Sequence, residues 1–182
     1  MEKVKTLVYQ WHVVYIRSRA EKKVESELQH KNIETYLPLQ RKLRQWSDRK
    51  KWVEMPLISG YLFVRISRKE YDQVLQATNV VSYVRFEGKA AIIPESQIES
   101  LQLMLKQDNL EITVTQENFE VGQKIEVVSG PLIGLQGKLV KIKGKNKVAV
   151  VLEKLGYSAI IEILTENLRI FESESDTDHL SF

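Results

Sequence analysis

The chain has 182 residues, of which 43% are hydrophobic and 28% charged, a composition typical of a folded protein with one ordinary domain or two small ones. It contains no cysteine, which excludes disulfides, thiol nucleophiles and cysteine-based zinc sites. The net charge of +3 is unevenly divided. Residues 1–106 hold 19 Lys and Arg against 12 Asp and Glu (+7), and residues 107–182 hold 8 against 12 (−4). Two domains of opposite charge are therefore predicted, the first of which is expected to make any contact with nucleic acid.

No segment predicts a membrane span or a catalytic centre. No apolar run approaches the roughly 18 residues that a spanning helix requires, and Gln10 and His12 interrupt the apolar N-terminal stretch, which is typical of a strand and not of a signal peptide. The three histidines lack metal-ligand spacing, and the sequence has neither a glycine-rich phosphate loop nor a nucleophile elbow. We therefore expect a cytoplasmic, non-enzymatic protein without a metal or cofactor.

Strand and helix patterns alternate in the first part of the chain, which predicts an α/β (α+β) sandwich with helices on a small, largely antiparallel sheet. Two helices are expected to begin at capping boxes, one formed by Ser18 and Glu21 and the other by Ser67 and Glu70. In chain order, the expected elements are a strand at 11–16, a helix at 18–31, strands at 34–39 and 51–66, a helix from 67, strands at 80–86 and 90–93, and a helix from Pro94.

The pattern changes after this α/β region, predicted at residues 8–106. Residues 107–119 are polar and acidic without a clear period, which is typical of a linker. Short strands separated by glycines then predict an all-β, SH3-like barrel at residues 120–172, and the acidic residues 173–182 are expected to be a disordered tail. The expected barrel strands are 124–128, 137–143, 147–152, 157–163 and 168–171.

The string from Val121 to Val140 is the most specific pattern in the sequence. Gly130 and Pro131 predict a turn, and Gly134 and Gly137 allow backbone conformations that are closed to residues with a Cβ atom. As a whole the string resembles a KOW motif, which occurs in NusG-like transcription factors and in some ribosomal proteins.

Three segments of the first part are similar to the N-terminal (NGN) domain of NusG, namely Trp11–Tyr15, Glu21–Val24 and Pro56–Val64. The resemblance covers residues 10–171 and is closer to the specialised RfaH-like paralogues, because Pro56-Leu57 precedes Tyr61–Val64 and Val84–Phe86 precedes Ile92–Pro94. One departure is Ser59-Gly60 before Tyr61, where the family commonly has proline.

The resemblance implies a hydrophobic depression that grips the clamp helices of the RNA polymerase β′ subunit. Half or more of the matching side chains are expected to serve the core as well, so the outward role is assigned mainly to Ile58, Tyr61 and Phe86. The matching positions are Tyr15, Ile58, Tyr61, Phe63, Tyr83 and Phe86.

Four cations surround the start of the first predicted helix, namely Arg17, Arg19, Lys22 and Lys23. A helix N-terminus with nearby cations attracts phosphates, although such residues can also form a merely solvated face. The resemblance implies that this face contacts single-stranded non-template DNA in the transcription bubble.

Thr78 matches a DNA-contacting position in the RfaH-like paralogue. Asn79, however, replaces an arginine there, and Glu27 replaces a histidine, so any base recognition is expected to differ from that of the paralogue.

The segment Arg41–Trp52 holds six cations and two tryptophans. Cations interleaved with aromatic rings suit single-stranded nucleic acid, but the segment could equally be a β-hairpin whose tryptophans pack inward. The candidate contacts in it are Arg41, Arg44, Trp46 and Arg49.

Together, these observations predict a monomeric transcription elongation and antitermination factor that promotes processive transcription of specific operons. The resemblance implies that its KOW domain recruits ribosomal protein S10 or the termination factor Rho. The alternatives are a housekeeping NusG-type factor and a KOW-containing ribosomal RNA-binding protein. The net negative charge of the barrel half argues against the second alternative.

Overall fold

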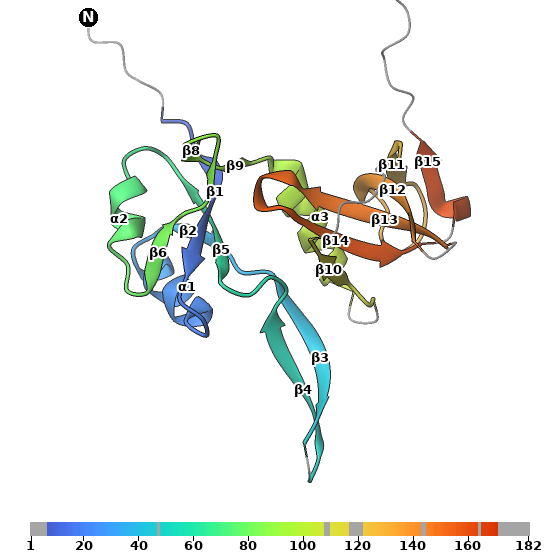
Figure 1. Ribbon diagram of the computed structural model, residues 1–182, viewed down its shortest axis with the longest axis horizontal. Helices are drawn as coiled ribbons and strands as arrows, with labels where there is room; N and C mark the ends of the chain where they lie inside the picture. Colours follow the sequence, from blue (N-terminus) through green and yellow to red (C-terminus); the bar gives the residue numbers. More distant parts are fainter. Residues whose placement is uncertain are drawn as a thin grey trace, which may run out of the picture. The chain divides into compact units, whose positions relative to one another are not determined.

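The chain folds into two units, Met1–Ile98 and Glu99–Phe182, which the computed structural model shown in Figure 1 describes separately. Its described residues are 7–46, 48–107, 110–116, 122–142, 145–163 and 165–170. The acidic residues 173–182, predicted as a disordered tail, lie outside these ranges.

The first unit is built on a five-stranded sheet around β1 (Gln10–Ile16). One neighbour of β1 is β5 (Tyr61–Ile66), whose other edge pairs with β2 (Glu34–Tyr36). The other neighbours are β6 (Val80–Tyr83) and β9 (Ile92–Ile93). Every pairing among the described strands is antiparallel, which confirms the predicted α/β region with a small antiparallel sheet.

Two described helices pack on this sheet, α1 (Glu21–His30) and α2 (Tyr71–Leu75). A third helix, α3 (Glu95–Leu105), spans the boundary between the two units. Val24 and Leu28 lie one turn apart on α1 and are fully buried, as the helical period predicts. They join the core with alternate residues of β1 and β5, including Val14, Ile16, Leu62, Val64 and Ile66. Burial of these branched side chains away from water is the main stabilising contribution to the unit.

The two predicted capping boxes have different outcomes. Ser67 and Glu70 do bond to each other, because the Ser67 backbone N–H and hydroxyl both donate to Glu70 Oε2. This contact precedes α2, however, whose N-cap residue is Glu70 itself and which has no side-chain cap. The box predicted for Ser18 and Glu21 is wrong: the N-cap residue of α1 is Ala20, and no side chain caps the helix. The carboxylate of Glu21 instead lies buried and accepts a hydrogen bond from a residue 39 positions away.

The basic segment forms a hairpin, in which β3 (Leu39–Gln45) pairs with β4 (Lys50–Pro56) along its full length. Among the described strands, these two pair only with each other. The single strand predicted at 51–66 is therefore two strands, β4 and β5, separated by residues 57–60. A second, short hairpin consists of β7 (Arg85–Phe86) and β8 (Lys89–Ala90).

The second unit contains a six-stranded antiparallel sheet, which confirms the predicted all-β region. Its spatial order is β10-β14-β13-β12-β11-β15, around buried residues that include Ile125, Leu135, Val148 and Leu152. The strands are β10 (Thr113–Thr115), β11 (Lys124–Val127), β12 (Gln136–Ile142), β13 (Lys145–Leu152), β14 (Tyr157–Glu162) and β15 (Leu168–Ile170). Short 3-10 turns lie at Glu153–Leu155 and Thr165–Asn167. Strand β10 falls inside the segment predicted as a linker.

The glycines of the KOW-like string serve two different geometries. Gly130 and Gly134 have φ of 84° and 87°, in the left-handed region that favours glycine, on either side of Pro131. Gly137 has no positive φ. A Cβ atom there would lie 2.7 Å from Val148 Cγ1 and 2.8 Å from the Ala149 carbonyl oxygen, so glycine is required by the close approach of β13.

Candidate functional site

Two of the predicted aromatic anchors meet on the surface of the first unit. Tyr15 on β1 lies directly across from Tyr61 on β5. Their rings pack edge to face, with centroids 5.5 Å apart and planes at 68°. Tyr15 is 46% exposed and Tyr61 is half-buried, so the pair presents aromatic surface to solvent while remaining fixed by the ladder of the sheet.

The turn that leads into Tyr61 is held by two hydrogen bonds of Gly60. The Gly60 N–H donates to Glu21 Oε1 at 2.9 Å, and its carbonyl oxygen accepts from the Ile16 N–H at 2.8 Å. Gly60 has a φ of 82°, and a Cβ atom at this position would lie 3.3 Å from Tyr15 Cε2. Glycine therefore allows the turn to pack against the Tyr15 ring. The role of Glu21 in this turn was missed by the sequence analysis.

Three other predicted anchors point into the protein. Ile58, to which an outward role was assigned, is only 4% exposed, and Phe63 and Tyr83 are also buried. The Tyr83 ring stacks on Tyr71 with centroids 4.0 Å apart, and its hydroxyl donates to the Tyr71 carbonyl oxygen at 2.9 Å. Burial raises the pKa of the Tyr83 hydroxyl above its ordinary value. In this conformation these three side chains serve packing.

Phe86 occupies a different place from the tyrosine pair. It lies on the β7–β8 hairpin and is 44% exposed. It makes no aromatic ring contact within the described part of the chain, so the fold leaves it as a separate apolar surface residue.

The predicted cations all lie exposed at the start of α1. Lys22 forms an ion pair with Glu54 of the β3–β4 hairpin, with 3.2 Å between Nζ and Oε2. Arg17, Arg19 and Lys23 have no ion-pair partner among the described residues. Because no side chain caps this helix, its first turn adds uncapped backbone N–H groups to the cationic surface.

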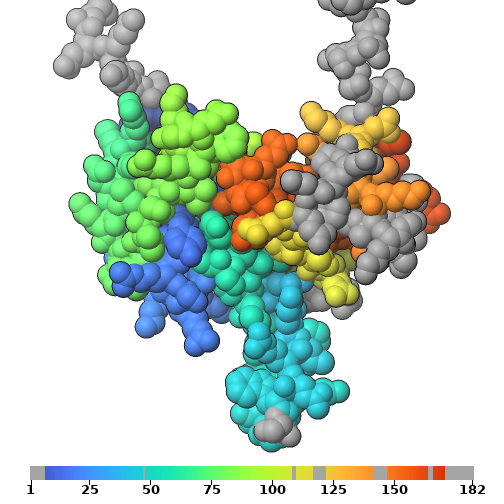
Figure 2. All heavy atoms as spheres, viewed as in Figure 1, coloured from blue at the N-terminus to red at the C-terminus, as the bar shows by residue number. Residues whose placement is uncertain are grey.

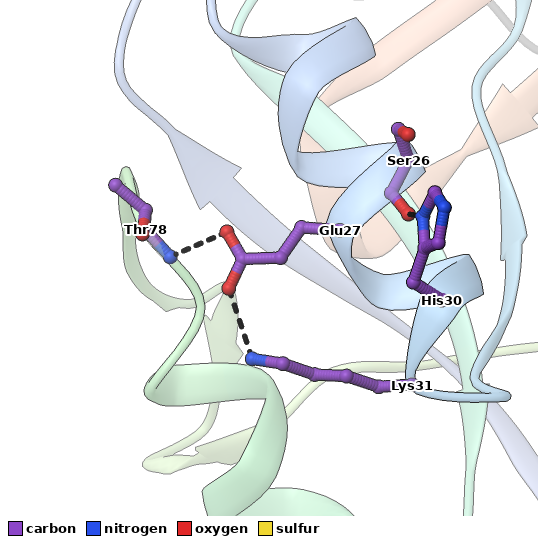
Figure 3. Close-up of polar contacts among 5 residues, drawn as sticks. All are labelled: Ser26, Glu27, His30, Lys31 and Thr78. Atoms are coloured by element: carbon purple, nitrogen blue, oxygen red, sulfur yellow. Dashed lines mark hydrogen bonds and ion pairs between the residues drawn. The ribbon is translucent and has the colours of Figure 1, made fainter.

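Thr78 lies beside this surface because two contacts hold its loop, of which Figure 3 shows the one with Glu27. The Thr78 N–H donates to Glu27 Oε2 at 3.0 Å, and the Asn79 carbonyl oxygen accepts from the Arg17 N–H at 3.0 Å. Glu27 also binds Lys31, with 2.9 Å between Oε1 and Nζ. The hydrogen bond from Lys31 holds the pKa of the Glu27 carboxyl below its ordinary value. An ionised carboxylate is therefore held beside the Thr78 loop.

The sequence left open whether the tryptophans of the basic hairpin face solvent or pack inward, and their exposure distinguishes the two. Trp46 is 56% exposed and Trp52 is 55% exposed, so neither packs inward. Figure 2 shows the hairpin, coloured cyan, standing clear of the rest of the first unit. Arg41, Arg44 and Arg49 are exposed on it together with the two rings.

Within the described ranges, no group of three or more His, Cys, Asp and Glu side chains is arranged to hold a metal ion. The described helices also include none that is long and apolar enough to span a membrane.

An α/β unit with exposed aromatic and cationic side chains, followed by an all-β unit, is the architecture of a binding protein. The family model described as "Transcription termination factor nusG" matches residues 9–102. Because this match covers more than half of the chain, the chain belongs to the NusG family. The family consists of transcription factors and not enzymes, and membership implies binding to RNA polymerase.

Two further comparisons accompany this match. No curated protein matches the chain. A solved structure, "Domain interaction in Thermotoga maritima NusG", is 19% identical, covers 91% of this chain and 98% of its own, and has a TM-score of 0.47.

Proposed function

We propose that this chain is an operon-specific elongation and antitermination factor, closer to the RfaH-like members of its family than to the housekeeping factor. The observation that carries the proposal is the exposed Tyr15–Tyr61 pair, which offers aromatic anchors to the clamp helices of the polymerase β′ subunit. Rigid rings bury a large area at little entropic cost, which is why tyrosine is frequent among the residues that dominate interface energies.

The cations at the start of α1 support a second contact, with the non-template DNA strand in the transcription bubble. The side chains of Arg17, Arg19 and Lys23 are exposed and have no ion-pair partner among the described residues, and Thr78 is held next to Arg17. Phosphates are attracted by these charges, and the exposed Thr78 side chain can reach a base. Because Glu27 adds a carboxylate here, base preference is expected to differ from that of the paralogue.

Antitermination follows if both contacts are stronger in the processive state of the polymerase. A factor that binds the clamp and the DNA strand together favours the closed clamp, and a ligand shifts such an equilibrium only by its difference in affinity for the two states. In this proposal the protein acts in the cytoplasm, and its KOW unit recruits ribosomal protein S10 or Rho.

The first test is a pull-down of core RNA polymerase with the wild-type chain and with Tyr61→Ala. We expect the substitution to weaken binding at least tenfold, in line with the loss of a hot-spot aromatic residue. Tyr9→Ala is the matched control, because Tyr9 is also an exposed tyrosine but precedes the opposite end of β1, roughly 20 Å away at 3.3 Å per residue. Equal binding by wild type and Tyr61→Ala would remove the clamp assignment.

Chromatin occupancy then separates the specialised factor from the housekeeping one. We expect occupancy at a few operons, and expect it to fall when Arg17 and Lys23 are both replaced by glutamine. Occupancy across all transcribed genes would instead assign the chain to the housekeeping class.

A further inference from the structure

The two faces of the β3–β4 hairpin differ in chemistry. Side chains alternate between the faces of a ribbon, and the register pairs Lys42 with Val53 and Arg44 with Lys51 on one face. Arg49 belongs to the same face, and its carbonyl oxygen accepts from the Trp46 N–H at 2.8 Å. This cationic face, defined by Lys42, Arg44, Arg49 and Lys51, contains no carboxylate.

Most of the opposite face is internally paired, apart from the exposed Lys50 across from Gln45. Leu43 lies directly across from Trp52, and the Arg41 guanidinium lies over the Trp52 ring, 5.8 Å from its centroid. Glu54, on this same face, is paired with Lys22 of α1. Its aromatic ring and its carboxylate therefore already have partners within the first unit.

Three of the four cations of the cationic face, by contrast, are electrostatically uncompensated. Arg44 lies directly across from Lys51, and like charges opposite each other destabilise an antiparallel ribbon. Lys42, Arg44 and Lys51 have no ion-pair partner among the described residues. The carboxylate nearest to this face is Asp48 in the turn, 3.9 Å from the Arg49 guanidinium. A bound polyanion would remove the repulsion that the hairpin maintains when free.

The spacing of the charges favours one nucleic-acid backbone over two. Cations two residues apart on one strand are separated by roughly 6.6 Å, and the two rows lie about 5 Å apart across the ribbon. Rows this close converge on a single chain of phosphates. Cations that reach both backbones of a duplex must instead span a groove about 6 to 12 Å wide.

Trp46 supplies the second element of such a site. Its ring is exposed, and the alternation of the strand places it on the same face as Lys42 and Arg44, next to the turn. A ring beside a row of cations is the arrangement that holds unpaired bases, because every base has a face that stacks and every nucleotide has a phosphate.

We propose that the cationic face of the hairpin binds single-stranded nucleic acid, with Lys42, Arg44, Arg49 and Lys51 on the phosphates and Trp46 stacked on a base. This site is separate from the α1 surface and does not depend on polymerase. It would allow the protein to bind a DNA or RNA strand directly, in addition to its contact with polymerase.

The test measures fluorescence anisotropy of the full chain with a labelled oligothymidylate, an oligouridylate and a duplex, all of one length and over a series of salt concentrations. The double variant Arg44→Gln/Lys51→Gln is expected to bind both single strands at least tenfold more weakly. Its plot of log affinity against log salt is expected to be shallower by about 1.4, since two phosphate contacts are lost. Trp46→Ala is expected to lose fivefold or more with an unchanged slope.

The matched control is Arg68→Gln/Arg85→Gln, which removes the same charge from two exposed residues of the first unit outside both surfaces. We expect it to change affinity less than twofold. A hairpin variant no weaker than this control would overturn the proposal, as would tighter binding of the duplex than of either single strand. Weaker binding of both single strands by the hairpin variant supports the proposal. The single strand that the wild-type chain binds more tightly, DNA or RNA, is then assigned as the natural ligand.

Discussion

Replacement of Glu21 tests whether the turn before Tyr61 depends on a distant carboxylate. Glu21 is buried and accepts the Gly60 N–H, so Glu21→Ala leaves a buried donor without a partner. An orphaned group of this kind costs about 1–3 kcal/mol. Loss of a negative charge in the first helical turn adds about 0.3–1 kcal/mol. The higher helix propensity of alanine offsets a few tenths of a kcal/mol. We expect the free energy of unfolding of the first unit to fall by about 2 kcal/mol.

Urea unfolding followed by tryptophan fluorescence isolates this unit. All three tryptophans belong to it, and only Trp11 is buried, so the emission shift reports Trp11 leaving the core. With a dependence of about 2 kcal/mol per molar urea, the midpoint is expected to move by roughly 1 M.

Two control variants separate the hydrogen bond to Gly60 from other effects of the substitution. Glu21→Gln keeps an oxygen acceptor and is expected to lose no more than about 1 kcal/mol. Ser18→Ala is expected to change stability by less than about 0.5 kcal/mol, because Ser18 does not cap α1. If Glu21→Ala were as stable as wild type, or Glu21→Gln as unstable as Glu21→Ala, the hydrogen bond to Gly60 would not be what holds the turn.

Three more predictions concern other parts of the chain. Gly60→Ala is expected to destabilise the first unit by about 1–2 kcal/mol, because alanine is strained at a φ of 82° and its Cβ would press on Tyr15; an unchanged urea midpoint would contradict this. Gly137→Ala is expected to destabilise the second unit by about 1–3 kcal/mol through overpacking against Val148 and the Ala149 carbonyl, measured as faster amide hydrogen exchange on β13. Glu27 has a lowered pKa, so its contribution to stability is present above the unfolded pKa and is lost as pH falls through the folded one. Glu27→Gln should therefore lose less stability than wild type between about pH 6 and about pH 3, and equal losses would refute the role of Glu27.

Strands β11 to β15 of the second unit were predictable because glycines separate most of their β-branched runs, whereas β10 was missed in the polar segment predicted as a linker. Predicted and observed strands such as 157–163 and Tyr157–Glu162 differ by one residue at an end. Helix α1 was equally clear from the spacing of Val24 and Leu28. In both cases the deciding signal is local, since it lies within one element and repeats with its period.

The parts that failed depend on contacts between distant residues. The apolar run from Met55 to Ile66 has the composition of one strand, and it is divided into β4 and β5 by contacts with distant residues, which bind Leu57 to Pro38 and Gly60 to Glu21. Ile58 and Tyr61 lie in that same run, yet one is buried and the other half-exposed. No strand periodicity relates them, because Ile58 lies in the turn between β4 and β5 and Tyr61 begins β5.

The independence of the β3–β4 hairpin bears on how such a protein can diversify. Its base is tied to the first unit at Pro38, whose carbonyl oxygen accepts the Leu57 N–H, and its strands share no ladder with the main sheet. Changes in length or sequence near the tip leave the core packing untouched, and extra loop residues cost little entropy. Related proteins could therefore exchange this ribbon, and with it a preference for one nucleic-acid target, while the polymerase-binding scaffold stays the same.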